Sequence, residues 1–277
     1  MAISKFEYAF LFGLKDSGLL AGRGALLELG EQHWHGDIPV EHFVRDLRTR
    51  GTDDEALQRL AQSAKVAKHT ESGTTAHDLV KLLYEAVFGT TDVTSIDLHG
   101  TDKAIALDLN ESVTLERQFD VVLNIGTGEH VFDVRIFFEN IHDLTAPGGL
   151  MLHVMPTQGW INHGFYCFQP TFYWDLAARN EYIVEAMFLQ VGNQLVRIQD
   201  ADSVSDVLTK LDRTQQLAFL QGSNAYVLMR KSRRYAELGK PMQGFFTQSR
   251  DDYNSSVRKQ WGQSTSDQTS SSLKKSS

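Results

Sequence analysis

The stretch Phe119-Asp120-Val121-Val122-Leu123-Asn124-Ile125 decides the fold, because it is an apolar strand pattern that runs into a polar residue near its end. Three similar runs occupy residues 25–30, 93–98 and 150–156. Short apolar runs separated by helical patterns are typical of strands buried on both faces, and therefore of a parallel sheet. Ligands of such sheets bind beyond the carboxyl ends of the strands. The sequence thus predicts an α/β fold with a ligand site at that edge.

Composition limits the class of protein. The chain has 277 residues, of which 42% are hydrophobic, and this is enough for one large domain. No apolar run reaches the roughly 18 residues that a membrane helix needs, and the first residues lack the pattern of a secretory signal. Cys167 is the single cysteine, which excludes an intramolecular disulfide and a multi-cysteine metal cluster. We therefore expect a cytoplasmic protein without a membrane span.

The charge is unevenly distributed along the chain. The net charge is -8, but residues 230–277 contain ten basic and four acidic side chains. The rest of the chain is therefore strongly acidic, which argues against a broad nucleic-acid surface. The basic end either contacts something anionic or keeps the chain in solution, and the sequence leaves both alternatives open.

Helical patterns separate the predicted strands. Apolar residues at helical spacing begin at Val40, Leu57 and Leu79, and another such pattern covers 132–145. Pro147-Gly148-Gly149 is expected to end that last helix and to turn the chain. Further elements are expected at these places: strands near 104–109, 182–190 and 224–231, and a helix from about Thr171.

The first turn, Glu28-Leu29-Gly30-Glu31-Gln32, resembles the first motif of the class I S-adenosylmethionine-dependent methyltransferases. In that motif an acidic residue and a variable residue follow an apolar strand and precede Gly-x-Gly. Glu28 and Gly30 match it, whereas Gln32 stands where the second glycine is usual. Later matches follow in the family's order over about 25–190, among them the pair Glu129-His130 and the Pro-Gly-Gly turn. The resemblance implies a doubly wound, mostly parallel seven-stranded sheet, the Rossmann-like methyltransferase fold.

The same resemblance implies a site for S-adenosylmethionine. Asp97, which ends the second strand, would accept the ribose hydroxyls, because a carboxylate accepts two such donors. Asp108 would face the adenine amino group, and Leu109 would pack on the ring. An acid or an amide at a strand end is otherwise a turn former or a helix cap. The complete implied set of cofactor-binding residues is Glu28, Gly30, Gln32, Asp97, Asp108, Leu109 and Asn124.

Two histidines are candidates for catalysis. His130 follows the strand that ends at Ile125, and His163 lies in the aromatic loop 158–170. Either imidazole is a candidate general base, because its ordinary pKa lies near neutrality. The alternative is packing and capping at a helix N-terminus for His130 and a structural hydrogen bond for His163. His33 and His35 have a spacing that suggests a metal, but no carboxylate–histidine cluster completes such a site. The sequence therefore predicts no metal.

The predicted domain organisation has one main body at 25–235, which carries a helical insertion at about 38–75 because the gap between Gly30 and Val93 exceeds a single helix. The insertion covers the cofactor, builds a substrate pocket or forms a contact in a homo-oligomer, and these alternatives stay open. The remaining predicted segments are a lead-in at 1–24, an extension at 236–261 and a disordered Ser-rich tail at 262–277.

These observations predict a methyltransferase that acts on a small polar acceptor, such as a sugar hydroxyl, in a pocket made by 158–174 and the insertion. The alternative is a non-catalytic binding or partner module, which Gln32 and the insertion favour. A nucleic-acid methyltransferase is a third hypothesis. Against it stand the acidic body and the tetrapeptide Asn124-Ile125-Gly126-Thr127, where such enzymes carry a sequence like Asn/Asp-Pro-Pro-Tyr.

Overall fold

The computed structural model describes residues 2–20, 24–50, 74–234 and 236–261. The chain forms two compact units, Met1–Leu107 and Asp108–Ser277, and each is described by itself. The predicted helix that begins at Leu57 and the predicted disordered tail at 262–277 lie outside the described residues. No helix of the described part of the chain is long and apolar enough to cross a membrane.

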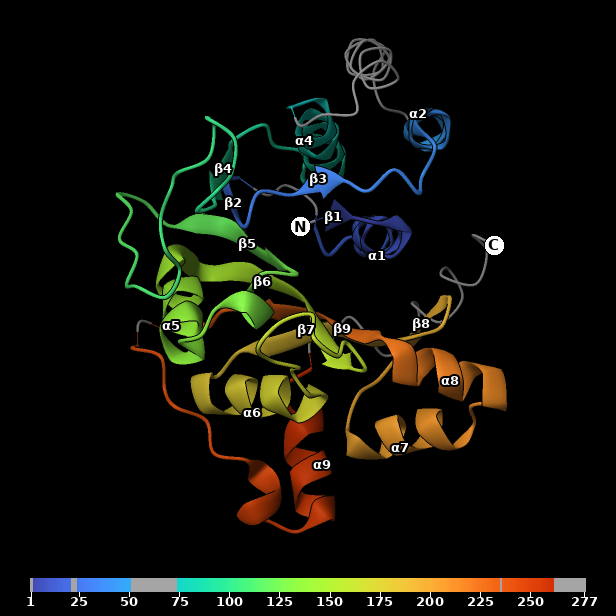
Figure 1. Ribbon diagram of the computed structural model, residues 1–277. Helices are drawn as coiled ribbons and strands as arrows, with labels where there is room; N and C mark the ends of the chain where they lie inside the picture. Colours follow the sequence, from blue (N-terminus) through green and yellow to red (C-terminus); the bar gives the residue numbers. More distant parts are fainter. Residues whose placement is uncertain (1, 21–23, 51–73, 235, 262–277) are drawn as a thin grey trace. The chain divides into compact units, whose positions relative to one another are not determined.

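The first unit contains two parallel strands of the predicted sheet (Figure 1). Strand β2 (Leu26–Leu29) pairs with β4 (Val93–Ile96), so that Leu29 lies opposite Ile96. Every residue of β2 is buried, which explains its uninterrupted apolar character apart from Glu28. A second small sheet joins β1 (Ala2–Ile3) in parallel to β3 (His33–Trp34).

Three described helices belong to the first unit: α1 (Lys5–Asp16), α2 (Val40–Thr49) and α4 (Thr74–Phe88). Helices α2 and α4 were expected from the apolar spacing that begins at Val40 and Leu79. Helix α1 was not expected, although Ser4 and Glu7 form a capping box at its start. Aromatic side chains join α1 to the rest of this unit, since Tyr8 makes edge-on ring contacts with Trp34 and Phe43.

The second unit is built on five strands in the order β5-β6-β9-β7-β8 (Figure 1). Strand β5 runs parallel to β6, whereas β9 is antiparallel to both β6 and β7, and β8 is antiparallel to β7. The bounds of the strands are β5 (Phe119–Ile125), β6 (Thr145–Gln158), β7 (Ile183–Val191), β8 (Gln194–Arg197) and β9 (Ser223–Arg230).

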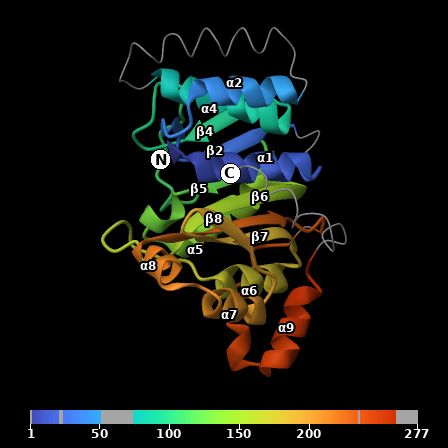
Figure 2. The ribbon, with the colours of Figure 1, turned by 90° about the vertical axis from the view of Figure 1, so that its right-hand side faces the viewer.

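Helices cover the five-stranded sheet of the second unit, and Figures 1 and 2 show α6 below it, between the strands and α9. The amide N–H of Gly244 donates to Asp175 on α6 over 3.3 Å and ties the last segment to that helix. The helices are η1 (Gly128–His130), α5 (Val134–Leu144), α6 (Pro170–Asn180), α7 (Ala201–Thr209), α8 (Arg213–Gln221), η2 (Gly244–Phe246) and α9 (Arg250–Arg258).

The predicted fold class is confirmed. Among the described residues, the seven main strands are divided between the units, two in the first and five in the second, and helices flank them. The three antiparallel pairings make the strand set mixed, with the parallel pairs at β2–β4 and β5–β6. The main domain predicted at 25–235 and its insertion stay predictions.

Two local predictions were wrong. The stretch 104–109 forms no strand, only an isolated bridge between Ile105 and Ile96. Its end is bent instead, because the Asp108 carboxylate accepts the backbone N–H of Asn110 over 2.9 Å. Strand β6 begins at Thr145 rather than Leu150, so the predicted Pro147–Gly149 turn lies inside it as an irregularity with Gly148 at a φ of 78°.

Candidate functional site

The turn after β5 depends on two glycines, Gly126 for its backbone conformation and Gly128 for its close packing. Gly126 takes a φ of 68°, which favours glycine, and a short 3₁₀ turn follows at Gly128–His130. A Cβ on Gly128 would lie 2.4 Å from a ring carbon of Phe137, so the backbone here packs directly against α5. Asp133 then caps α5 by accepting the N–H of Ile136 over 3.0 Å.

Asn124 holds this turn in place from within β5. Its side-chain oxygen accepts the N–H of Gly128 over 3.1 Å, and its amide nitrogen lies 3.2 Å from Nδ1 of His153. The side chain is completely buried. Asn124 was predicted to bind the cofactor, and the structure places its side chain in the support of the turn.

Glu129 is the buried centre of the turn. Its side chain is 1% exposed, and its carbonyl accepts the N–H of Phe165 over 2.7 Å. A Cβ on Gly164 would meet that carbonyl at 2.8 Å, so Gly164 permits the close approach of the two segments. Burial raises the pKa of the Glu129 carboxyl from its usual value of 4.5 to about 7. Because this pKa lies near neutral pH, a small change in the groups around the carboxyl changes its charge.

Both predicted catalytic histidines face this carboxylate. Oε1 of Glu129 lies 3.8 Å from Nε2 of His130 and 3.6 Å from Nε2 of His163. The ring centroids of the two histidines are 5.0 Å apart, and their side chains are 44% and 41% exposed. Burial, and next the neighbouring His163, lower the pKa of His130. The arrangement joins a buried carboxylate to two imidazoles that solvent reaches.

Exposed aromatic side chains lie in the same two segments as the histidines. The ring of Trp160 lies 4.9 Å from that of His163 between centroids, and the rings of Phe132 and Phe165 meet edge-on at 6.0 Å. Phe132 and Phe165 are both largely exposed. Large exposed aromatic side chains beside polar groups are typical of a ligand-binding surface. Sequence analysis predicted such a surface for the loop that contains His163.

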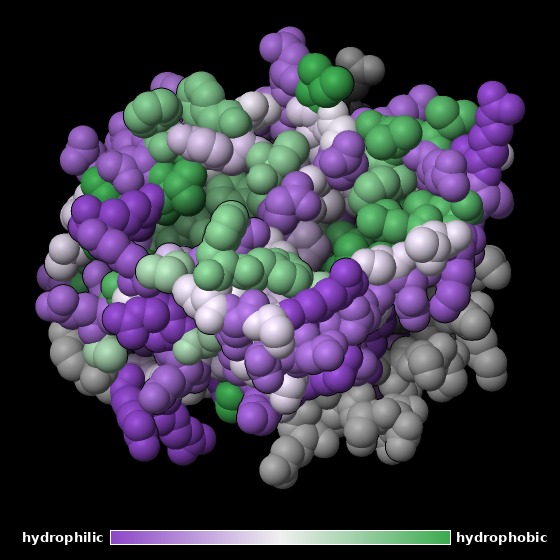
Figure 3. Space-filling model, turned by 90° about the horizontal axis from the view of Figure 1, so that it is seen from below, coloured by the Kyte–Doolittle hydropathy of each residue, from purple (hydrophilic) through white to green (hydrophobic). Residues whose placement is uncertain are grey.

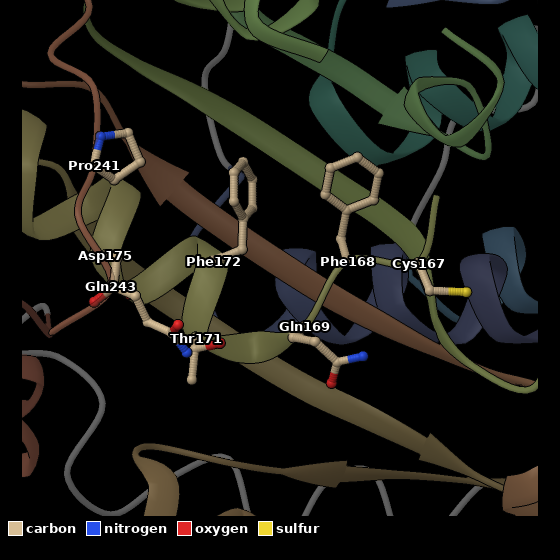
Figure 4. Close-up of a pocket in the computed structure, with 8 residues that line it drawn as sticks. All are labelled: Cys167, Phe168, Gln169, Thr171, Phe172, Asp175, Pro241 and Gln243. Carbon is tan, nitrogen blue, oxygen red and sulfur yellow. The ribbon is translucent and has the colours of Figure 1, made fainter. Parts of the chain in front are cut away.

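A pocket of about 370 Å³ lies further along this loop. Figure 4 shows the rings of Phe168 and Phe172 directed to the same side, with Cys167 pointing away from them. Figure 3 views the molecule from below and shows hydrophobic residues gathered in patches between hydrophilic ones. Five of the residues that line the pocket fall in the predicted pocket segment 158–174. The lining residues are Cys167, Phe168, Gln169, Thr171, Phe172, Asp175, Pro241 and Gln243.

In the first unit, the turn after β2 contains the predicted Gly30, and Gln32 stands where the second glycine of the motif is usual. Gly30 has a φ of 78° and donates its N–H to the carbonyl of Ile96 over 2.7 Å. Gln32 is buried, and its amide nitrogen donates back to the carbonyl of Gly30 over 3.0 Å. The glutamine therefore folds onto the turn itself.

Asp97 is half-buried at the end of β4. One of its carboxylate oxygens accepts the N–H of Glu31 over 2.8 Å, and the other accepts the N–H of His99 over 2.9 Å. Each carboxylate oxygen can accept a second donor. Asp97 thus has capacity left for two hydroxyl groups.

Glu28 has a different environment in the same unit. It is completely buried in β2, forms an ion pair with Lys81 and accepts the hydroxyl of Ser95 over 2.6 Å. Lys81 also donates to the Ser95 hydroxyl over 2.8 Å. This predicted cofactor residue is therefore tied to Lys81 and Ser95 through Oε1 of its carboxylate.

The last two predicted cofactor residues begin the second unit. Asp108 is exposed, and its carboxylate accepts both the backbone N–H and the side-chain amide of Asn110, which lower its pKa. Leu109 is 7% exposed. The structure places Asp108 in a turn and Leu109 largely inside the unit.

Comparison with protein families gives a match over much of the chain. The model of a methyltransferase domain matches residues 42–212, more than half of the chain. The chain belongs to this methyltransferase family. The enzyme is thus an S-adenosylmethionine-dependent methyltransferase, as the sequence predicted. The match begins after Glu28, Gly30 and Gln32, so it does not include the substituted glycine motif.

Solved structures give only distant likenesses, and no curated protein matches the chain. The chain is similar to the StiE O-methyltransferase, with 14% identity, a TM-score of 0.41 and coverage of 91% of this chain and 77% of that one. It is similar to an O-methyltransferase of a Brevibacillus brevis trans-AT PKS multienzyme in complex with S-adenosyl-L-homocysteine, with 11% identity, a TM-score of 0.38 and coverage of 91% and 76%. It is also similar to the [4+2]-cyclase SpnF, with 12% identity, a TM-score of 0.40 and coverage of 82% and 81%.

The residues of the methyltransferase fit its cofactor in part. A left-handed glycine after β2 and a half-buried acid with free acceptor capacity after β4 suit an adenosyl group. Gln32 departs from the family pattern, because its side chain satisfies the Gly30 carbonyl. Sequence analysis missed Glu129 as a site residue, although it had quoted the Glu129-His130 pair.

Proposed function

We propose that the methyltransferase transfers its methyl group to a hydroxyl of a small polar acceptor, such as a sugar, with His163 as the general base. The observation that supports this proposal best is the position of Nε2 of His163, 3.6 Å from a buried carboxylate oxygen of Glu129. A hydroxyl is a weak nucleophile until a base takes its proton. A half-exposed imidazole with an acid behind it is suited to that task.

S-adenosylmethionine, when bound, would supply an electrophilic methyl group, and its sulfur would leave as a neutral thioether when a nucleophile attacks the methyl carbon. The side chains have the remaining work of orienting the acceptor and holding its proton. Nδ1 of His163 accepts the hydroxyl proton, while Nε2 carries its own proton towards Oε1 of Glu129, which stabilises the imidazolium that forms. A carboxylate behind an imidazole has this role in other enzymes, where it also fixes the ring. The 3.6 Å separation exceeds a hydrogen bond, but such contacts often tighten only when substrate binds.

His130 is the second candidate base, since it faces the same carboxylate oxygen at 3.8 Å. Burial lowers the pKa of His130, so this imidazole stays neutral to lower pH. We assign His163 the first role because its ring also packs beside Trp160, in the loop that reaches the pocket.

For the cofactor, we propose that Asp97 binds the ribose hydroxyls and that Gly30 lets the backbone approach the ligand. Asp108 and Leu109 remain our candidates for the adenine ring. Glu28, Gln32 and Asn124 would act by holding strands and turns in place, because hydrogen bonds within the protein occupy their side chains.

For the acceptor, the support is the mixture of groups around His163. Trp160, Phe132 and Phe165 offer exposed rings, and Gln243 offers an amide in the pocket of the same loop. Aromatic walls with a few polar groups are usual in sites for small molecules. A polar metabolite with several hydroxyls would use both kinds of contact.

The test is methyl transfer from S-adenosylmethionine with a labelled methyl group to a panel of free sugars, nucleotide sugars and phenols. We expect a methyl ether from at least one sugar and a loss of at least about 100-fold in the His163→Ala variant. The control is His42→Asn, an exposed histidine on α2. A product methylated on nitrogen or carbon, or an unchanged rate in His163→Ala, would contradict the proposal.

A further inference from the structure

Glu129, His130 and His163 offer more than a pair for proton transfer. One potential ligand atom from each of the three side chains lies within 4.8 Å of the other two. In a tetrahedral zinc site with bonds of about 2.0–2.2 Å, neighbouring ligand atoms are roughly 3.3–3.5 Å apart. The observed contacts of 3.6 and 3.8 Å from Oε1 to the two Nε2 atoms come close to that spacing. Small rotations of two half-exposed rings would complete it.

The buried carboxylate supplies a second, independent observation. Oε2 of Glu129 is inaccessible and has no hydrogen-bond partner within the described residues. In the same part of the chain, the ion-pair partners recorded for Glu129 are the two imidazoles, which are charged only when protonated. A buried carboxylate without a fixed cation is costly. A cation held between Glu129 and the neutral imidazoles removes that cost.

The geometry points to a site for one divalent transition-metal cation of the Zn²⁺ class, with Glu129, His130 and His163 as its three protein ligands. Two imidazole nitrogens and one carboxylate oxygen suit this class of metal better than Mg²⁺ or Ca²⁺, which prefer oxygen ligands. Three protein ligands leave a fourth position for water or another small ligand. The exposed sides of both histidines give solvent access to that position.

The local structure also holds the ligands in place. The N–H of Phe165 donates to the carbonyl of Glu129 over 2.7 Å and fixes the loop of His163 against the turn of His130. Asn124 holds the same turn through Gly128. Sequence spacing did not show this cluster, because His163 lies in a different segment from the other two ligands.

One consequence rests on the proposed function. A cation bound to Nε2 of His163 and to Glu129 takes away the carboxylate that would stabilise the imidazolium and makes the ring a weaker base. Zn²⁺ should therefore inhibit methyl transfer, and a chelator should restore it. The binding of the metal itself does not depend on the reaction that the enzyme catalyses.

The experiment measures binding without any turnover. The full-length protein, treated with a chelator and dialysed, is titrated with Zn²⁺ by calorimetry and with Co²⁺ by visible absorption. The variants are Glu129→Gln, His130→Asn and His163→Asn. The control is His33→Asn, which removes a histidine from the other imidazole pair, where the rings of His33 and His77 lie 5.9 Å apart. Circular dichroism checks that each variant is folded.

We expect one Zn²⁺ per chain with a Kd of about 1 μM or tighter, weakened at least about 30-fold in each of the three variants and unchanged in His33→Asn. Co²⁺ should give the visible absorption of a tetrahedral site. No saturation below about 100 μM Zn²⁺ would overturn the proposal. Equal weakening in His33→Asn, or unchanged binding in Glu129→Gln, would also overturn it. If the wild type transfers methyl groups but does not bind Zn²⁺, the metal site is wrong and the proposed function stands. If the wild type binds Zn²⁺ but methylates no acceptor of the panel, the proposed function is wrong and the metal site stands.

Discussion

Two glutamates of this chain, Glu28 and Glu129, are both buried, but different groups lie beside their carboxylates. Glu28 in β2 is completely buried, and Lys81 and Ser95 bind its carboxylate. Glu129 after β5 is buried almost as fully, but its carboxylate faces two imidazoles that carry a charge only when protonated. The first glutamate has a permanent cation beside it, and the second has a conditional one.

The difference shows how burial alone fails to identify a functional acid. A carboxylate with a lysine at hand is neutralised within the fold and has little left to offer a ligand. A carboxylate whose partners carry a charge only when protonated can accept a proton or hold a metal at little further cost. On this basis we assign Glu28 to the stability of the first unit and Glu129 to chemistry in the second.

The largest effect should come from Glu129→Gln. Glutamine keeps the shape of the side chain but cannot stabilise an imidazolium, so we expect kcat/KM for methyl transfer to fall about 100- to 1,000-fold, or about 3–4 kcal/mol. The measurement is steady-state kinetics with the acceptor that the panel identifies. A fall in kcat/KM of less than fivefold would contradict the assignment of Glu129 to the chemistry of methyl transfer.

The next effect should come from Glu28→Leu, measured as the free energy of unfolding in urea. The change leaves Lys81 and Ser95 without their acceptor, and we expect a loss of about 2–3 kcal/mol. We place the figure below that of a fully buried pair because the Lys81 side chain is 27% exposed. Unchanged stability would show that the ion pair contributes little to the first unit.

The third effect concerns pH and has a definite sign. Burial raises the pKa of folded Glu129 from 4.5 to about 7, so the folded state keeps its proton where the unfolded state has lost it. The stabilising contribution is complete below pH 4.5 and is lost as the pH rises to about 7. Relative to Glu129→Gln, the chelator-treated wild type should lose about 3 kcal/mol of unfolding free energy across that window. Parallel stability curves for the two proteins would contradict the assigned pKa.

The smallest effect should come from Asp97→Ala. Removing the acceptor for the ribose hydroxyls should weaken S-adenosylmethionine binding about tenfold, or about 1.4 kcal/mol, by calorimetry. Asp97→Asn should weaken it less, because the amide oxygen still accepts hydrogen bonds. Equal binding by the wild type and Asp97→Ala would remove our ribose assignment and leave the first unit without its proposed contact.

The buried strands could be predicted from sequence because their signal is local. Residues 119–125 are a mostly apolar run, and β5 has those bounds. Strand β6 extends beyond its apolar run because pairing with β5 and β9 recruits Thr145 and Gln158. Helix α1 carried a readable signal in Ser4 and Glu7, but its buried aromatic residues follow no simple apolar alternation.

The candidate site could be predicted only in pieces. His130 and His163 were each selected by local context, and the structure brings their rings to 5.0 Å. Their shared carboxylate could not be inferred, because the approach of the two segments depends on Gly164 packing against the Glu129 backbone. The hydrogen bonds that hold Asn124 and Gln32 within the fold could not be inferred either, because they depend on the conformation of the turns.

The central claim is that Glu129 and His163 act as one unit in taking the acceptor proton. A double-mutant cycle on kcat/KM for methyl transfer, with Glu129→Gln, His163→Ala and the double variant, tests it most directly. We predict that the double variant is no slower than His163→Ala within about twofold, because the glutamate has no role without the imidazole. If the two losses multiply in the double variant, the residues act independently and the claim is wrong.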